Sequence, residues 1–351
     1  MTNETMNAAR LYGARDLRME RVAVPVPTPG QALVRVRAVS VCGSDLHYYR
    51  EAGIGDSRPK DPLVLGHELA GEVVEMADSG SDGAHRLAPG TLVAIDPNIA
   101  CEACEHCLAG NPNLCPHVRF AGTPPTDGGL QEYLAWPAHL LRPLPSGMSA
   151  EVGALLEPLG VCIHALDLAH VRLASTVAVL GAGTIGLLVT KLAALSGASR
   201  VFTTDVLPAR LAVAQAFGAH EVVNASQHDP VAIIRDRTGG RGVDVVIECA
   251  GAPHTPCQAV ELVRPGGTIV LVGIPSDDRT EFPASQARRK GVTIKLSRRM
   301  KHVYDRAISL VEAGLVDLPQ LVSHRYPLNH TPDAFKALDR GDGVVKAVIL
   351  A

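Results

Sequence analysis

The segment that most limits the fold of this chain is a glycine turn between an apolar strand and a helical segment. The apolar run VAVL at 177–180 leads directly into GAGTIG, and an amphipathic helical pattern follows. At this spacing the first glycine allows a tight turn, the second lets the backbone approach a pyrophosphate, and the third permits close helix packing. The helix N-terminus adds positive potential. A plain turn rarely needs three glycines at this spacing, so the strand, turn and helix predict a dinucleotide site with these contacts: Gly181, Gly183, Thr184, Ile185 and Gly186.

Asp205 ends the next strand-like run and predicts which dinucleotide binds. It follows Gly186 by 19 residues, where a carboxylate accepts hydrogen bonds from both ribose hydroxyls and repels a 2′-phosphate. This position favours NAD over NADP. Arg210 lies close enough in the sequence to keep NADP open, and we include it among the cofactor contacts. The alternative for Asp205 is a solvated residue at a strand end.

Two kinds of sequence pattern divide the chain into a part rich in strands and a part in which strands and helices alternate. With 351 residues the chain exceeds the usual size of a single core. In the first ~150 residues, stretches such as QALVRVRAVSV at 31–41 alternate apolar and polar side chains, as half-buried strands do. Apolar runs then alternate with helical patterns, which indicates a parallel sheet covered on both faces. We predict an α/β fold with a doubly wound Rossmann NAD-binding domain at 157–294, and a β-rich catalytic domain, discontinuous in sequence, at 1–156 and 295–351.

Four cysteines in one short loop predict a metal site. Cys101, Cys104, Cys107 and Cys115 have the spacing C-x2-C-x2-C-x7-C, and four thiolates close a tetrahedral zinc site. Such close spacing lets a loop without a core of its own fold around one ion. An iron–sulfur cluster also uses four thiolates and is the alternative.

A second donor set is spread over two segments. Cys42 is followed 25 residues later by His67 and then by Glu68. A cysteine, a histidine and a carboxylate suit an open zinc site, whose fourth position takes water or substrate. Each residue alone has an ordinary explanation, as a buried thiol, a structural histidine or a surface carboxylate. Beside a dinucleotide turn, the three together indicate catalysis.

The composition excludes several classes of partner. The formal net charge is −3 and is spread along the chain, so neither nucleic acid nor a membrane surface is an expected partner. The first residues lack a basic start followed by an apolar run, and the apolar stretches look too short to span a bilayer. We expect a cytoplasmic protein whose partners are small molecules or further copies of itself.

The chain resembles the zinc-dependent medium-chain dehydrogenase/reductase superfamily, and within it the sorbitol (polyol) dehydrogenases. The similarity runs along essentially the whole chain, through CGSDLHYY, GHELAG, the four-cysteine loop, LLEPLGVCIHA and RPGGTIVLVG. It implies a GroES-like catalytic domain, NAD, and two zinc ions per chain, one of them structural in the four-cysteine loop. It also implies that Cys42, His67 and Glu68 bind the catalytic zinc. Glu157 is then an exchangeable fourth ligand or is bonded to the zinc water.

The resemblance also implies a reaction and roles for nearby side chains. Zinc acts as a Lewis acid on the substrate hydroxyl, and NAD takes the hydride. Ser44 takes the hydroxyl proton, and His47 resembles the outer member of a relay to solvent. Tyr48 and Arg299 contact the substrate. Asp45 is expected to support the site rather than act as a base.

The substrate class and the assembly follow from the same resemblance. The expected reaction oxidises a secondary hydroxyl of a polyol or sugar-derived alcohol to a ketose or ketone. Met300 stands where a tyrosine is common and Arg298 adds a positive charge, so an idonate-like sugar acid or a cyclitol stays open as the substrate. A zinc-free quinone or enoyl reductase has no use for the catalytic ligands, and a non-catalytic nucleotide-binding or redox-sensing protein is the remaining alternative. The family implies a homo-oligomer, either a tetramer or a dimer. We expect the strand TIVLVG at 268–273 to lie at a sheet edge, where it could pair with the same strand of a second copy across a two-fold axis.

Overall fold

The computed structural model describes residues 4–77, 87–341 and 344–351, which form two compact units. The first unit comprises Met1–Glu157 and Tyr304–Ala351, and the second comprises Pro158–Val303. The chain passes into the second unit within helix α3 (Ala150–Ala169). It leaves that unit after Val303, later than the boundary at residue 294 expected from the sequence. The reason is that β16 (Thr293–Leu296) still extends the sheet of the second unit.

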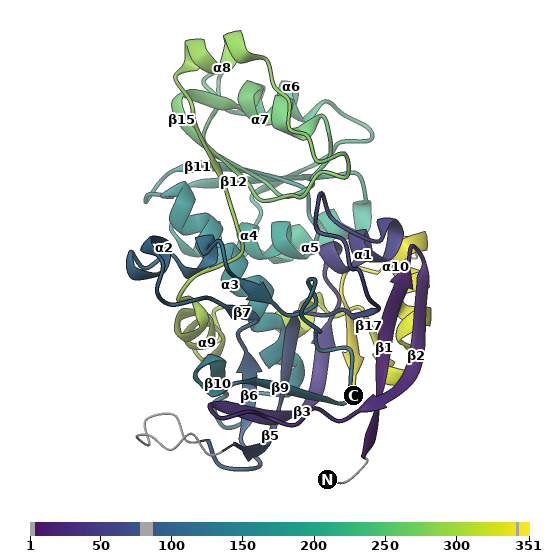
Figure 1. The fold of residues 1–351 in the computed structure, drawn as a ribbon. Coiled ribbons are helices and arrows are strands. Elements are labelled where there is room, and N and C mark those ends of the chain that lie inside the picture. The colour runs from purple at the N-terminus through teal and green to yellow at the C-terminus, as the bar shows by residue number, and fades with distance from the viewer. Residues whose placement is uncertain (1–3, 78–86, 342–343) are drawn as a thin grey trace. The chain divides into compact units, whose positions relative to one another are not determined.

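Mostly antiparallel strands build the first unit (Figure 1), and β17 and β18 are its parallel pair among the described residues. Strand β3 (Gln31–Ser40) lies inside its main sheet, where it pairs with β5 (Glu68–Met76), β9 (Tyr133–Pro137) and the C-terminal strand β18 (Ala347–Leu350). The end of the chain therefore packs beside strands from its beginning. The other strands of this sheet are β6 (Leu92–Ile95), β10 (Leu141–Pro143) and β17 (His324–Pro327); β1 (Thr5–Gly13), β2 (Asp16–Ala23) and β4 (Leu63–Val64) form a second sheet, and β7 (Asn98–Ile99) pairs with β8 (Arg119–Phe120).

Helices of the first unit cover an aliphatic core that contains few aromatic rings. Leu11, Leu69, Trp136 and Phe335 are almost completely buried in it. The Tyr49 ring packs on Phe335 with centroids 5.4 Å apart, which joins the first helix to the last. Helices α1 (Gly43–Glu51) and α10 (Thr331–Arg340) carry these two rings, and the first unit also contains helices α2 (Glu105–Leu108) and α9 (Tyr304–Glu312).

The second unit is a parallel sheet with the strand order β13-β12-β11-β14-β15-β16 among the described residues. Counted from β11, this is the order 3-2-1-4-5-6 of a doubly wound nucleotide-binding sheet. The segment TIVLVG falls in β15 and the residues after it, between β14 and β16, so its expected place at a sheet edge was wrong. The strands are β11 (Thr176–Leu180), β12 (Arg200–Asp205), β13 (Glu221–Asn224), β14 (Val243–Glu248), β15 (Val263–Leu271) and β16, and the helices are α4 (Thr184–Leu195), α5 (Pro208–Ala216), α6 (Pro230–Arg237), α7 (Thr255–Leu262) and α8 (Ala284–Lys290).

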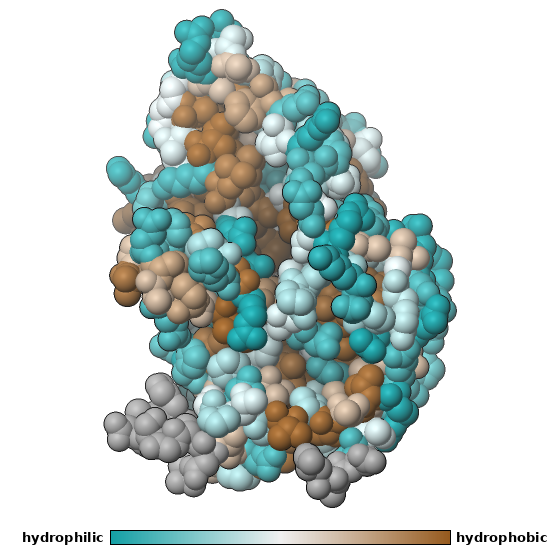
Figure 2. Space-filling view, viewed as in Figure 1, coloured by the Kyte–Doolittle hydropathy of each residue, from teal (hydrophilic) through white to brown (hydrophobic). Residues whose placement is uncertain are grey.

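Helix α3 is the one described helix with the length and composition of a membrane span. It has 20 residues, and 83% of its most apolar window is buried inside the protein. From the sequence we expected no apolar stretch of that length. Burial explains the composition of α3, because a core helix needs apolar residues on all sides. On the face drawn in Figure 2, hydrophilic residues lie over much of the surface, with apolar groups between them.

Candidate active site and metal centres

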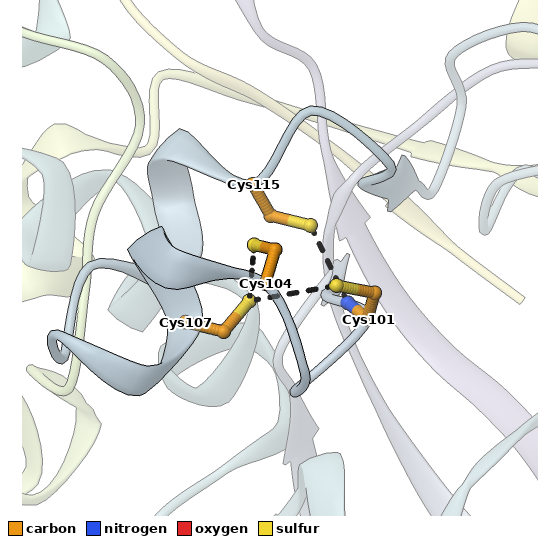
Figure 3. A group of neighbouring side chains, drawn as sticks. All are labelled: Cys101, Cys104, Cys107 and Cys115. Atoms are coloured by element: carbon orange, nitrogen blue, oxygen red, sulfur yellow. Dashed lines mark hydrogen bonds between the residues drawn. The ribbon is translucent and has the colours of Figure 1, made fainter.

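The four-cysteine loop brings its thiols together around one point (Figure 3). The Sγ atoms of Cys104 and Cys107 are 3.4 Å apart, and those of Cys101 and Cys107 are 3.9 Å apart. The backbone N–H of Cys101 donates to Cys115 Sγ over 3.4 Å. Helix α2 begins after Cys104 and contains Cys107, so a single helical turn sets the spacing of these two ligands.

The thiols of this loop differ strongly in pKa. The backbone N–H groups of Ala103 and Cys104 lower the pKa of Cys101 to about 6. Desolvation and the neighbouring thiols raise the pKa of Cys107 to about 12. Thiols this close cannot all ionise without a cation between them. The donor set thus fits a soft divalent metal such as zinc.

The second donor set converges where β3 ends and β5 begins. Ser40 of β3 pairs with Glu68 of β5. Cys42 follows two residues after Ser40, and His67 immediately precedes Glu68. One donor atom from each of Cys42, His67 and Glu68 lies within 4.8 Å of the others. His67 and Glu68 are buried while Cys42 is half-buried, so the set suits a metal with one accessible side.

Asp45 supports this donor set from the first turn of α1. Its carboxylate accepts the backbone N–H of Cys42 over 2.9 Å and that of Gly66 over 3.2 Å. It also lies 3.4 Å from His67 Nδ1. Burial lowers the pKa of His67, but Asp45 and Cys42 together outweigh burial and hold this pKa well above its usual value. A carboxylate on one ring nitrogen orients the imidazole and leaves the other nitrogen for a metal.

Glu68 has two further partners that are buried with it. Ser40 Oγ and Lys346 Nζ both donate to Glu68 Oε2. Sequence reasoning missed Lys346. The only signal in the sequence is a single lysine in the apolar run VVKAVIL at 344–350.

Glu157 lies near the Cys42 set without joining the cluster of donors. It is 4% exposed and sits in α3. Burial raises the pKa of its carboxyl to about 8; the charges of His67 and Lys346 oppose this shift, and that of Glu68 adds to it. Glu157 is therefore within electrostatic reach of the donor set, although its oxygens are outside the three-atom group.

Helix α1 carries the other residues expected to act in the first unit. Ser44 is half-buried in its first turn. His47 Nδ1 lies 3.9 Å from Glu51 Oε1, one turn further on. Tyr48 is 4% exposed, and its hydroxyl is 2.8 Å from Ser57 Oγ, so this phenol links the helix to the following loop.

The glycine turn has the geometry that a dinucleotide needs. Gly181 has a φ of +96°, and a Cβ on Gly186 would lie 1.8 Å from the Gly181 carbonyl oxygen. A Cβ on Gly183 would meet nothing within 4 Å, so open space lies beside the turn. Helix α4 starts at Thr184, and Ile185 follows in its first turn. The turn fits a pyrophosphate at the helix N-terminus.

Asp205 is tied to this turn by backbone hydrogen bonds. Its Oδ2 accepts the N–H of Ala182 over 2.7 Å, and its Oδ1 accepts the N–H of Leu207 over 2.9 Å. Arg210 Nη1 lies 3.8 Å from Asp205 Oδ2. The carboxylate stands at the carboxyl end of β12, beside the glycine turn, with a guanidinium next to it.

Arg299 belongs to a short segment of the second unit with unusual backbone angles. Its φ is +53°, and that of His302 is +48°. Between them Met300 is 4% exposed, and its Sδ lies 2.5 Å from where a Cβ on Gly160 would be. The departure from tyrosine at position 300 is thus accommodated by a glycine in α3, and Met300 anchors the segment that carries Arg299.

Comparisons with known proteins agree with this architecture. Residues 28–146 match the family of alcohol dehydrogenase GroES-like domains, and residues 184–313 match the zinc-binding dehydrogenase family. Sorbitol dehydrogenase of Bacillus subtilis (strain 168) is 35% identical over 333 residues, which cover 95% of this chain and 93% of that protein.

Solved structures extend the comparison. A zinc-binding dehydrogenase from Sinorhizobium meliloti 1021, bound to NADP, has a TM-score of 0.89 and 34% identity, covering 99% of this chain and 100% of its own. L-Idonate 5-dehydrogenase of Escherichia coli has a TM-score of 0.89 and 29% identity, covering 99% of both chains. These matches confirm the predicted fold class and family. The chain is an oxidoreductase that belongs to the zinc-dependent medium-chain dehydrogenase/reductase superfamily, in its sorbitol dehydrogenase-like branch.

Proposed function

We propose that the chain is an NAD- and zinc-dependent dehydrogenase that oxidises a secondary hydroxyl of a polyol or sugar-derived alcohol to a ketose or ketone. The observation that carries this proposal is the convergence of Cys42, His67 and Glu68 within 4.8 Å. A thiolate, an imidazole and a carboxylate are the donors of an open zinc site. The similarity to sorbitol dehydrogenase supplies the substrate class.

The proposed roles follow from where each side chain lies. Zinc, when bound, supplies Lewis acidity to the substrate hydroxyl, and NAD supplies the hydride acceptor. Cys42, His67 and Glu68 hold the metal, and Glu157 is the fourth ligand or bonds to the zinc water. The four-cysteine loop holds the structural zinc.

Proton movement is assigned to helix α1. Ser44 accepts the proton of the substrate hydroxyl, and His47 passes it towards solvent. Glu51, an exposed residue one turn further along α1, lies 3.9 Å from His47 Nδ1 and marks the solvent end of this route. Tyr48 and Arg299 contact the substrate.

A sugar acid is the second candidate substrate. The structural similarity to L-idonate 5-dehydrogenase favours it, and so do the two consecutive arginines, Arg298 and Arg299, since arginine binds carboxylates through paired hydrogen bonds. A cyclitol would use the same proton and hydride chemistry. A non-catalytic nucleotide-binding or redox-sensing role is the less favoured reading, because it leaves the open metal site without a purpose.

An assay of initial rates over a substrate panel tests the proposed function. We expect NADH formation at neutral to mildly alkaline pH with one or more of tetritols, pentitols, hexitols, cyclitols and aldonic acids, and slower turnover of simple secondary alcohols. A preference for an aldonic acid that is lost in Arg299→Gln but kept in the control Arg289→Gln, which changes an arginine in the last turn of α8, would favour the sugar acid. A zinc-loaded protein that binds NAD but turns over no member of the panel would contradict the proposal.

Asp205 is proposed to select NAD, and its replacement tests this selection. In Asp205→Ala we expect the ratio of kcat/KM with NAD to kcat/KM with NADP to fall about 10- to 100-fold, since a hydrogen bond to a charged group contributes ~1.5–3 kcal/mol. The matched control is Asp229→Ala, whose carboxylate also accepts a backbone N–H, at the start of α6. An unchanged ratio would mean that Asp205 supports only the glycine turn.

We also propose a location and an assembly. None of the eight cysteines, all of which lie in the described part of the chain, forms a disulfide, which suits the reducing cytoplasm. We propose that the first unit is the GroES-like catalytic domain and the second the Rossmann NAD-binding domain. A homodimer or homotetramer is proposed from the family. Among the described residues β16, and not TIVLVG, is the edge strand of the parallel sheet, and its open side could pair with a second copy.

A further inference from the structure

Lys346 is a buried cation whose ammonium group lies next to the proposed catalytic metal ligands. Its side chain is 3% exposed. Nζ donates to the carbonyl oxygen of Val41 over 3.0 Å and to Glu68 Oε2. Val41 is the residue before Cys42. A lysine is rarely this buried unless its charge is paired and hydrogen-bonded, and Glu68 provides that pairing here.

The backbone around Lys346 is fixed on both sides. Its carbonyl oxygen accepts the N–H of Ser323 over 3.0 Å, and its own N–H donates to Ser323 Oγ over 3.2 Å. The N–H of Val41 donates to the carbonyl oxygen of Ala347 over 2.9 Å, next to the pairing of β18 with β3. The ammonium is therefore held beside Glu68 by the residue that directly precedes β18, and it cannot shift without breaking hydrogen bonds at the edge of that strand.

Glu68 depends on these donors for its orientation. Ser40 Oγ and Lys346 Nζ both bond to Oε2, so the rotation of the carboxylate is fixed and Oε1 is left as the oxygen for a metal. A buried carboxylate without a cation bears a large desolvation cost. Lys346 offsets this cost before any metal binds.

We propose that Lys346 is a positioning residue of the catalytic metal centre, which holds Glu68 as an oriented ligand and ties it to the Val41–Cys42 backbone. This inference rests on the proposed role of Cys42, His67 and Glu68 as zinc ligands. Groups that orient metal ligands in this way typically change metal affinity by about 10- to 100-fold when they are removed.

The test is the rate at which a chelator removes zinc from the intact protein. Wild type should lose its two zinc ions in two kinetic phases, identified because Cys42→Ser lacks one phase and Cys104→Ser lacks the other. In Lys346→Met we expect the Cys42-dependent phase to be about 10- to 100-fold faster, with the Cys104-dependent phase unchanged. Lys346→Arg, which keeps the charge and the donors, should restore most of the retention.

Lys290→Met is the matched control. Lys290 Nζ donates to three backbone carbonyls, those of Val260, Glu261 and Val263, at 2.7–2.8 Å. Its removal should lower the melting temperature and leave both release phases as in wild type. If Lys346→Met does not fold, Ser40→Ala, which removes the other donor to Glu68, should still speed the Cys42-dependent phase.

The outcomes separate this inference from the proposed function. Equal acceleration of both phases in Lys346→Met would mean that Lys346 only supports the fold, and unchanged release would mean that it does not position Glu68; either result overturns the inference and leaves the proposed function intact. A wild-type protein with no Cys42-dependent zinc would overturn both.

Discussion

Cys42→Ser is expected to remove one of two zinc ions per chain and to lower turnover at least about a thousandfold. The magnitude follows because Lewis acidity contributes several kcal/mol to such a reaction and each ~1.4 kcal/mol is a factor of ten. Serine is nearly the same size as cysteine, but its hydroxyl does not ionise at neutral pH and is a poor zinc ligand. Zinc content, kcat and kcat/KM measure the effect.

Dinucleotide binding separates a lost metal centre from a misfolded protein. The glycine turn and Asp205 belong to the second unit, whereas Cys42 belongs to the first. Cys42→Ser should therefore bind NADH as wild type does, as measured by NADH fluorescence. Cys257→Ser is the control, because Cys257 is far from both donor sets in sequence and its thiol donates to the Glu281 carbonyl over 3.3 Å. Retained turnover in Cys42→Ser would reject the proposed catalytic site.

Cys104→Ser should have the largest effect on stability. Its Sγ lies 3.4 Å from Cys107 Sγ, and the loop from Cys101 to Cys115 contains only the short helix α2 and one 3-10 turn. In zinc-finger peptides a structural ion contributes ~10–16 kcal/mol. We expect a smaller loss here, roughly 3 kcal/mol or more, because the rest of the first unit has its own core; at ~2–4 °C per kcal/mol this lowers Tm by about 6–12 °C.

Limited proteolysis and metal analysis locate this effect. The loop should become the first site of cleavage, one zinc should be lost, and the folded fraction should keep Cys42-dependent turnover. Cys257→Ser again serves as the control for a cysteine outside the loop. A Cys104→Ser protein with two zinc ions and an unchanged Tm would contradict the structural-zinc assignment, and bound iron with sulfide in wild type would favour the cluster alternative.

Features that depend on neighbouring residues could be read from the sequence. The spacing of the four cysteines and of GAGTIG is local, so a turn and a few φ angles decide the geometry. The alternation of apolar runs and helical patterns predicted the parallel sheet, and the matching families confirm the fold class. The family resemblance was confirmed as well.

Features that depend on which strands pair could not be read in this way. We expected TIVLVG at a sheet edge because nothing in its own sequence reveals that β16 lies beside it. Strand β16 also places the second domain boundary later in the chain than we expected. Met300 was recognised as a departure, but its packing on Gly160 requires a contact between α3 and a distant loop.

The sequence by itself determined the family, the sheet class, the dinucleotide turn and the residue types of two donor sets, because each is encoded in short motifs. Only the tertiary structure decided how the donors of the second set meet, through the pairing of Ser40 with Glu68. It also decided the partner of Glu68. Lys346 is 278 residues away from Glu68 in the chain, and no local pattern predicts a contact over that separation. The contact exists because β18, which follows Lys346, pairs with β3. Burial of this lysine would be unfavourable without the charge of Glu68 beside it.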